Sequence, residues 1–320
     1  MSYVYFNIVF YVKKEYCYAN SKANKINIYY KNMINLFKTI EINKSNNNVK
    51  LILFTNIDVP IKFKNEFNSM NVKIIIRDNK HIPPKGYYNM WQGTFFYLDA
   101  VDYFKEIMTK KDLLIMIDPD CLVTKDITPI VDSIKREKIV NYRVEYPFEY
   151  SQNGLSRKEI KKIIFEENNK DINTVFFGGE FYGFCGEKIH EVSSELEKAW
   201  HISLNRFENK KEYFKTEEHI FTYVFYKIGA NSGVANKFLK RMWTAPDFNN
   251  IEKNDKDYII WHLPAEKNRG LIKIYNKDII KSVDKKDLQK KFEKIIGIPN
   301  KGIKRYSYDK IYCILKRILK

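Results

Sequence analysis

The sequence LLIMIDPD, residues 113–120, joins five consecutive apolar residues to two carboxylates. An uninterrupted apolar run of this length is typical of a strand that is buried on both faces of a sheet. Residues i and i+2 of an extended chain point the same way, and Pro119 fixes φ between them, so Asp118 and Asp120 can converge on one divalent ion. Carboxylates suit Mn²⁺ or Mg²⁺, which keep part of their coordination shell for substrate phosphates. The alternative is a solvated acidic turn, and the surrounding segments decide between the two.

The segments around this strand alternate between strand-like and helix-like patterns. Such alternation predicts an α/β fold with a parallel-centred sheet, in which ligands bind beyond the carboxyl ends of the strands. Asp118 and Asp120 would lie at such an end. Residues 151–171 are polar enough to form an exposed excursion. The expected strands are residues 7–12, 49–55, 72–77 and 113–117, and the expected helices are residues 22–40 and 88–104.

The charge of the chain restricts its partners. Its 320 residues carry a formal charge of +17, although a compositional bias toward lysine would give the same sign. A strongly basic chain favours nucleic acid, an anionic lipid surface or a phosphorylated substrate. Because the sequence contains no zinc-finger spacing, no RNA-recognition signature and no long basic helix, we expect no nucleic-acid partner.

The cysteines and the first apolar segment indicate where the chain works. Four cysteines are scattered without a C-x-x-C pair, which indicates neither a zinc knuckle nor a disulfide framework, and a reducing cytosol is the simplest location. Residues 3–12 lack a preceding basic region and are too short to span a bilayer, so we expect a first core strand. The cysteines are Cys17, Cys121, Cys185 and Cys313.

Several motifs follow one another in an informative order. They are VFYVKK (9–14), FT (54–55), WQ (91–92), the D-x-D pair, FFGGEFYGF (176–184), TEEH (216–219) and PAEKN (264–268). In this order the chain resembles the GT-A-fold glycosyltransferases. It is most similar to the retaining family that includes the blood-group A and B transferases and α1,3-galactosyltransferase, over residues 3–270.

The sequence departs from that family at two places. Leu98-Asp99 stands near the position where family members carry a basic residue for the donor sugar. Trp261-His262 before Leu263-Pro264 is more similar to the third metal ligand of the lipopolysaccharide galactosyltransferase and glycogenin family. A histidine beside a tryptophan can equally be a satisfied core residue, so both interpretations of His262 stay open.

The resemblance implies a GT-A-type, Rossmann-like nucleotide-sugar-binding sheet with flanking helices. It also implies a metal-dependent transfer of a hexose from a nucleotide-diphosphate sugar, UDP-linked, to a glycan or glycolipid acceptor, with retention and with Mn²⁺ or Mg²⁺ as cofactor. The implied residues are Phe10, Tyr11 and Val12 for the uridine; Trp91, Asp118 and Lys267 for the rest of the donor; Asp118, Asp120 and His262 for the metal ion; and Gly178, Gly179 and Glu180 for the acceptor.

Glu217 is the candidate catalytic residue. If Thr216 caps a helix, Glu217 falls on one face with four apolar residues at helical spacing. The resemblance implies that a glutamate here acts as nucleophile or stabilises an oxocarbenium-like transition state. Glu218 lies off that face and suits an acid that complements the helix dipole. The four apolar residues are Phe221, Val224, Phe225 and Ile228.

The last segment has the pattern of a basic amphipathic helix, which is typical of a protein that is peripheral on the inner face of a membrane. The alternative is a last helix packed on the domain. We expect a catalytic part, residues 1–285, and a tail, residues 286–320, whose removal after Asn300 should leave turnover of a soluble acceptor largely unchanged. The apolar residues of the pattern are Ile311, Ile314, Leu315, Ile318 and Leu319, and the basic ones are Lys304, Arg305, Lys310, Lys316, Arg317 and Lys320.

Two other classes of function compete with this interpretation. Phosphatases of the haloacid dehalogenase class also place D-x-D after a hydrophobic strand, but near the start of the chain and with Thr or Val at the offset where this chain has Leu122. A non-enzymatic basic nucleic-acid-binding protein would leave the aspartate pair and Glu217 unexplained.

Overall fold

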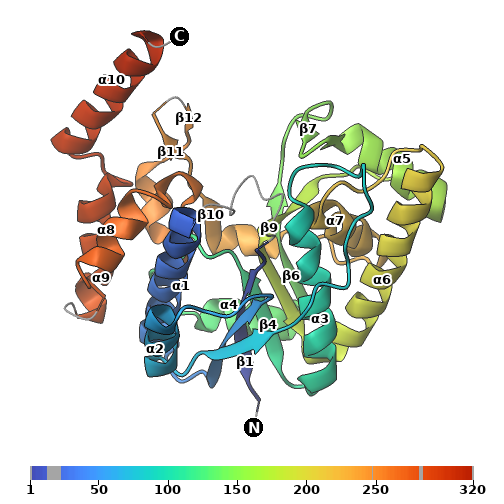
Figure 1. The fold of residues 1–320 in the computed structure, drawn as a ribbon, viewed down its shortest axis with the longest axis horizontal. Coiled ribbons are helices and arrows are strands. Elements are labelled where there is room, and N and C mark those ends of the chain that lie inside the picture. The colour runs from blue at the N-terminus through green and yellow to red at the C-terminus, as the bar shows by residue number, and fades with distance from the viewer. Residues whose placement is uncertain (1, 13–22, 247, 281–283, 319–320) are drawn as a thin grey trace.

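A computed structural model describes residues 2–12, 23–246, 248–280 and 284–318 (Figure 1). Some positions used in the predictions above lie outside the described residues. They are Lys13, Lys14, Cys17, Lys22, Leu319 and Lys320.

A six-stranded mixed sheet forms the centre of the molecule, with strand order β3-β2-β1-β4-β9-β6 (Figure 1). The first four strands pair in parallel, whereas β9 runs antiparallel to both of its neighbours. The predicted mixed α/β architecture with a largely parallel centre is therefore confirmed. The strands are β1 (Val4–Phe10), β2 (Val49–Thr55), β3 (Lys73–Ile76), β4 (Leu113–Ile117), β6 (Ile139–Val144) and β9 (Phe176–Cys185).

Helices cover both faces of the sheet, which explains the uninterrupted apolar sequence of β4. Leu114 and Met116 belong to the hydrophobic cluster on one face, and Leu113, Ile115 and Ile117 belong to the cluster on the other. Alternate side chains of a strand point to opposite faces, so both sets are buried. The first face is covered by η1 (Gln92–Phe95), α3 (Phe96–Ile107), α5 (Arg157–Asn168), α6 (Gly186–Glu208) and α7 (Glu217–Lys227), and the second by α1 (Ala23–Asn43), α2 (Ile61–Ser69) and α4 (Thr128–Glu137).

A second, three-stranded sheet directly follows the aspartate pair. It consists of β5 (Cys121–Val123), β13 (Ile260–His262) and β10 (Leu239–Arg241), with β13 in the middle. His262 pairs with Cys121 across the β13–β5 ladder, so a residue from late in the chain lies next to Asp120. Trp261, also in β13, is fully buried, as expected for a core residue.

Short elements connect and cover these sheets. They are β7 (Ser151–Gln152), β8 (Leu155–Ser156), η2 (Val234–Lys237), β11 (Thr244–Ala245), β12 (Phe248–Asn249), η3 (Lys253–Asp257), η4 (Pro264–Glu266), α8 (Gly270–Asn276), α9 (Lys285–Phe292) and the π-helical turn η5 (Glu293–Gly297).

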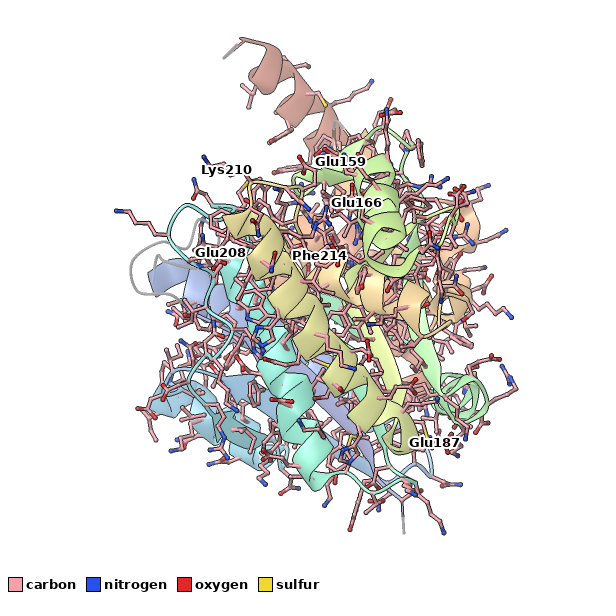
Figure 2. All side chains as sticks on the ribbon, turned by 90° about the vertical axis from the view of Figure 1, so that its right-hand side faces the viewer. Glu159, Glu166, Glu187, Glu208, Lys210 and Phe214 are labelled. Atoms are coloured by element: carbon pink, nitrogen blue, oxygen red, sulfur yellow. The ribbon has the colours of Figure 1, made fainter. Side chains whose placement is uncertain are left out.

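Two sequence-based expectations about local structure were wrong. The helix expected from residue 88 begins only after Trp91, which has left-handed backbone geometry with φ 59° and precedes the 3₁₀ turn η1. Residues 151–171 do not form an exposed excursion, because α5 has a capping box at Ser156 and buries three isoleucines at helical spacing. Arg206 of α6 also donates to Glu166 and Glu167 of α5, which holds the two helices together (Figure 2).

The chain ends in helix α10 (Ile303–Ile318), which projects from the body of the molecule (Figures 1 and 2). No helix in the described part of the chain is long and apolar enough to cross a membrane. Leu288 and Phe292 of α9 pack in a hydrophobic cluster with Leu122 and Trp261. The division into a catalytic part and a tail stays a proposal, and these contacts favour restricting the tail to α10.

Candidate functional site

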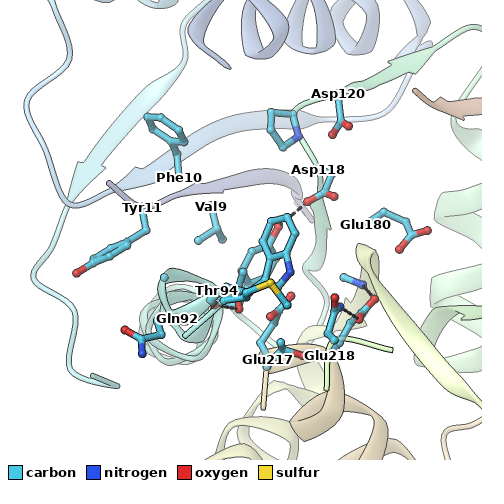
Figure 3. Close-up of a pocket in the computed structure, with 18 of the residues that line it drawn as sticks. Val9, Phe10, Tyr11, Gln92, Thr94, Asp118, Asp120, Glu180, Glu217 and Glu218 are labelled. Carbon is cyan, nitrogen blue, oxygen red and sulfur yellow. Dashed lines mark hydrogen bonds between the residues drawn. The ribbon is translucent and has the colours of Figure 1, made fainter. Parts of the chain in front are cut away.

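A cavity of about 480 Å³ opens at the carboxyl ends of β1 and β4 (Figure 3). Its walls come from segments far apart in the sequence, as expected at this edge of an α/β sheet. Most of the predicted site residues contribute to it. The lining residues include Val9, Phe10, Tyr11, Trp91, Thr94, Tyr97, Asp118, Asp120, Asn153, Gly179, Glu180, Thr216, Glu217, Glu218, Arg241 and Lys267.

Asp118, Asp120 and His262 form a cluster that could hold a metal ion. One ligand atom of each lies within 4.8 Å of the others. Nε2 of His262 is 3.3 Å from Oδ2 of Asp120 and 3.6 Å from Oδ2 of Asp118. The β13–β5 pairing places His262 beside the aspartates, so the structure favours the ligand interpretation of this histidine over the core interpretation.

The bonding state of Asp120 fits a metal ligand. Its side chain is fully buried, and its Oδ2 lies 3.1 Å from Nζ of Lys267 and 3.3 Å from Nε2 of His262. A buried carboxylate is costly unless positive charge compensates it, so this position suits a cation. Asp118 accepts a hydrogen bond from the hydroxyl of Tyr97 at 3.1 Å. Two carboxylates and one imidazole form a donor set that a divalent ion such as Mn²⁺ accepts.

Neighbouring charges shift the pKa values of this cluster in opposite directions. Burial, with Asp120 next to it, raises the pKa of Asp118 to about 6. Burial alone would also raise the pKa of Asp120, but the Lys267 and His262 cations lower it below its usual range. Burial lowers the pKa of His262, but Asp120 outweighs it and raises that pKa to about 9. Nζ of Lys267 lies 3.1 Å from Oδ2 of Asp120. The cluster therefore already attracts positive charge.

Glu180 of β9 forms a buried ion pair with Arg241 of β10. Nε and Nη2 of Arg241 donate to the two carboxylate oxygens at 2.6 Å each, which is the paired geometry of a strong charge-assisted bond. Burial opposes ionisation of Glu180, but Arg241 lowers its pKa to about 2. A Cβ on Gly178 would lie 2.0 Å from Oε2 of Glu180, so the glycine leaves room for this pair.

Glu217 and Glu218 begin α7 and are both buried at the cavity (Figure 3). Burial, followed by repulsion from Glu218, raises the pKa of Glu217 to about 8. Glu218 accepts hydrogen bonds from Gln152 and Asn153 at 2.8 and 3.0 Å, and Arg241 lies 3.6 Å away. The expectation that Glu218 lies off the buried face was wrong, because α7 is covered on all sides and every residue from 217 to 226 is buried.

The predicted uridine-binding residues divide into two groups. Phe10 and Tyr11 line the cavity, and the ring of Tyr11 lies over Gly93, where an added Cβ would come within 2.5 Å of it. Val12 is not a lining residue, and its backbone is occupied by Asn56, which accepts from its N–H at 2.8 Å and donates to its carbonyl at 2.9 Å.

The remaining predicted residues occupy distinct places. Trp91 lines the cavity and is 49% exposed, so it is not a core residue. Gly179 lines the cavity, whereas Gly178 lies behind it against the Glu180–Arg241 pair. Asp99 is turned away and pairs with His81 at 2.8 Å, so it does not stand in for a donor-binding residue.

Sequence reasoning missed Arg241 and Tyr97. Arg241 stands in the short strand sequence LKR, which matches no motif, and only its contact with Glu180 marks it. Tyr97 stands in an apolar helix start, and its hydroxyl reaches Asp118. Its position five residues after the WQ motif at 91–92 offered a weak signal.

Comparison with known proteins identifies the fold. Neither a protein-family model nor a curated protein matches the chain. Among solved structures, the bifunctional glycosyltransferase WbbM in its apo form matches with a TM-score of 0.57 and 14% identity, over 90% of this chain and 51% of that one. The chain thus spans about half the length of WbbM.

Two further structures match over nearly their whole length. Apo mouse xyloside xylosyltransferase 1 has a TM-score of 0.52 and 14% identity, over 83% of this chain and 99% of that one. The galactosyltransferase LgtC, in complex with donor and acceptor sugar analogues, has a TM-score of 0.52 and 13% identity, over 87% of this chain and 96% of that one. The chain has the fold of GT-A glycosyltransferases. The predicted fold is confirmed.

Proposed function

We propose that this protein is a metal-dependent glycosyltransferase that moves a hexose from a UDP-linked sugar to a glycan or glycolipid acceptor. The observation that carries the proposal is the convergence of Asp118, Asp120 and His262 at one edge of the cavity, with Glu217 among the same lining residues. A hard cation at one edge suits a diphosphate, and a buried carboxylate suits a developing positive charge on a sugar.

The proposed donor site extends along the carboxyl end of β1. Phe10 and Tyr11 offer aromatic surface to the uridine, and Trp91 offers an exposed indole further along the cavity. Asp118, Asp120 and His262 would hold Mn²⁺ or Mg²⁺, which as a Lewis acid lowers the barrier for departure of the diphosphate. Lys267 adds a fixed positive charge beside the same oxygens.

Glu217 is the proposed catalytic residue. Its carboxylate would act as nucleophile or stabilise an oxocarbenium-like transition state, and its raised pKa makes its charge available only as the pH rises toward about 8. The proposal of retention rests on the family resemblance. For the acceptor we propose Gly179 and Glu180, which line the cavity, with Gly178 providing space behind them.

We also propose that α10 docks on an anionic lipid surface at the cytoplasmic face of a membrane. Ile303, Ile311, Ile314 and Leu315 are 87%, 57%, 56% and 52% exposed. Exposed lysines, including Lys310, accompany them. The apolar side chains can enter the lipid layer, and the lysines are attracted to the anionic headgroups. Each lysine contributes about 1 kcal/mol to membrane binding.

Truncation after Lys310 tests this docking while retaining the base of α10. Full-length protein should co-sediment with vesicles that contain phosphatidylglycerol, less so as salt increases, and the truncated chain should stay in the supernatant. A double substitution of Ile314 and Leu315 by Ser is the matched control for the apolar contribution. Equal binding of both chains, or equal binding to uncharged vesicles, would contradict the proposal.

The competing functions explain less of the site. In a phosphatase of the haloacid dehalogenase class the aspartates would act without His262 and Glu217 beside them. A nucleic-acid-binding role would need a basic groove, whereas five acidic side chains line this cavity: Asp118, Asp120, Glu180, Glu217 and Glu218.

A screen of nucleotide sugars tests the proposed function. UDP-, GDP- and dTDP-linked hexoses are incubated with the protein and Mn²⁺, Mg²⁺ or a chelator, and release of the nucleoside diphosphate is measured. We expect turnover of a UDP-hexose that stops in chelator. Binding of an oligonucleotide without turnover of any donor, or hydrolysis of simple phosphomonoesters instead, would overturn the proposal.

A further inference from the structure

The base of α10 is attached to the catalytic body through one buried guanidinium. Arg305 is 8% exposed. Its Nη1 donates to Oε1 of Glu266 at 2.9 Å and to the carbonyl of Ile296 at 3.0 Å. Its Nη2 donates to the carbonyl of Thr244 at 2.6 Å, and its Nε donates to Asp309 at 3.0 Å. Arg305 thus contacts four separate points of the chain and does not belong to the exposed basic face of the helix.

Glu266 is the centre of this network. It is 1% exposed, accepts from the hydroxyl of Thr244 at 2.5 Å, and accepts from the N–H of Gly270 at 3.0 Å. A Cβ on Gly270 would lie 2.7 Å from Oε2 of Glu266, so the carboxylate is closely enclosed. Nη2 of Arg269 lies further away, 3.7 Å from Oε1 of Glu266. An enclosed carboxylate depends on its buried cation, and here that cation comes from α10.

The same network borders the segments that carry the site. Glu266 directly precedes Lys267, whose Nζ lies beside Asp120. The N–H of Leu263, which follows His262, donates to the carbonyl of Asp120 at 3.0 Å. Thr244 lies three residues after Arg241. Residues 263–270 are therefore tied to Asp120 through Leu263 and Lys267, and to Arg305 through Glu266, which lies between them.

We propose that Arg305 is a positioning residue that fixes the 263–270 loop and so aims Lys267 at the donor diphosphate. The role of Lys267 in this proposal rests on the proposed function. On this account α10 has two parts: a base that completes the framework of the site, and an outer part that is free for a membrane. Truncation after Asn300 would remove the base, so turnover would not survive as the sequence alone suggested.

Two measurements on the full-length chain test the proposal. Arg305→Met removes the charge at similar length, Arg305→Lys keeps the charge, and Lys304→Met is the control at the neighbouring exposed position. Hydrogen exchange of residues 263–276 reports the loop directly. Affinities for UDP and for UMP, each with Mn²⁺, report the diphosphate separately from the nucleoside.

We expect Arg305→Met to exchange faster in residues 263–276 and to bind UDP about tenfold more weakly, since a charged hydrogen-bonding contact becomes misplaced, with little change for UMP. Arg305→Lys should recover part of both effects, and Lys304→Met should match the wild type. Equal weakening of UDP and UMP would indicate a merely structural role and overturn the positioning claim, as would unchanged exchange.

A second variant tests the proposal in case Arg305→Met does not fold. Glu266→Gln combined with Arg305→Met removes the unpaired carboxylate of Glu266, while Asp309 keeps Nζ of Lys301 at 3.4 Å. The double variant should therefore fold and still show faster exchange and selective loss of UDP affinity. If the wild type binds no nucleoside diphosphate, the proposed function is wrong, and exchange alone then decides whether Arg305 fixes the loop.

Discussion

Two buried glutamates line the same cavity in opposite electrostatic surroundings. Glu180 on β9 is held by two hydrogen bonds from Arg241, and its pKa falls to about 2. Glu217 at the start of α7 faces Glu218, and its pKa rises to about 8. Among the described residues, no lysine, arginine or histidine forms an ion pair with Glu217, whereas Arg241 pairs with Glu180 and Glu218. Glu180 is therefore a fixed charge, whereas Glu217 can gain and lose a proton near neutral pH.

Two adjacent glycines make room for both glutamates. A Cβ on Gly178 would meet Glu180, and a Cβ on Gly179 would lie 2.7 Å from Oε1 of Glu217. The glycines thus permit two acidic side chains to approach the same stretch of β9. Pairs of groups whose surroundings separate their pKa values are typical of sites in which one group orients and the other reacts. We therefore propose that Glu180 with Arg241 orients the bound substrate and that Glu217 is the group that reacts.

The largest expected effect concerns the ion pair between Glu180 and Arg241. Arg241→Met removes both hydrogen bonds that hold buried Glu180 and leaves only Nδ1 of His262 3.6 Å away, so the free energy of unfolding should fall by about 3 kcal/mol. Denaturant unfolding at pH 7 measures this loss. The double variant Glu180→Gln/Arg241→Met removes both charges and should regain most of the stability. Equal stabilities of the single and double variants would show that the pair is not the cause.

The next effect concerns the reacting glutamate. Glu217→Gln keeps the shape of the side chain but removes its charge, so kcat for donor turnover should fall on the order of 10²-fold or more while the fold persists. Steady-state kinetics at pH 8 measures the change. An unchanged kcat in Glu217→Gln would show that this residue is structural, and would contradict the different roles proposed for Glu180 and Glu217.

The smallest effect is a difference in the pH dependence of stability. Between pH 4.5 and 8 folded Glu217 keeps a proton that the unfolded chain has released, so its contribution to stability declines as the pH rises through this window. Glu217→Gln should therefore match the wild type near pH 4.5 and become progressively more stable than the wild type as the pH rises above 4.5.

Glu180→Gln should behave in the opposite way. The folded-state pKa of Glu180 is lowered to about 2, so its ionised form adds stability above the unfolded value of 4.5, and this is lost as the pH falls toward 2. Unfolding curves at several pH values in metal-free buffer measure both variants. Parallel curves for Glu217→Gln and Glu180→Gln would contradict the contrast.

Local patterns predicted the framework of the site well. The apolar run before Asp118 predicted β4 with its observed bounds. A strand that is buried on both faces consists of consecutive apolar residues, and this pattern can be recognised without knowing the neighbouring strands. Residues 49–55 were likewise predicted with the bounds of β2. For His262 the sequence left a metal ligand and a core residue both open, and the β13–β5 pairing brings it beside the aspartates.

Contacts between distant segments were not predictable in the same way. Glu217 was selected because it shares a helix face with apolar residues. Since α7 is buried on all sides, this helical spacing did not distinguish Glu217 from Glu218. Arg241 and Arg305 resemble ordinary surface arginines in sequence. Their partners Glu180 and Glu266 lie 61 and 39 residues away, and only the folded chain brings them together. The roles assigned to individual site residues remain predictions.

The central claim is that the aspartate pair supports metal-dependent turnover of a nucleotide sugar. The most direct measurement compares release of UDP from a UDP-hexose by the wild type and by Asp120→Asn, with Mn²⁺ and with excess chelator. Our account predicts turnover by the wild type only when Mn²⁺ is present, and none by a folded Asp120→Asn. Full activity of the wild type in chelator, or of Asp120→Asn with Mn²⁺, would contradict it.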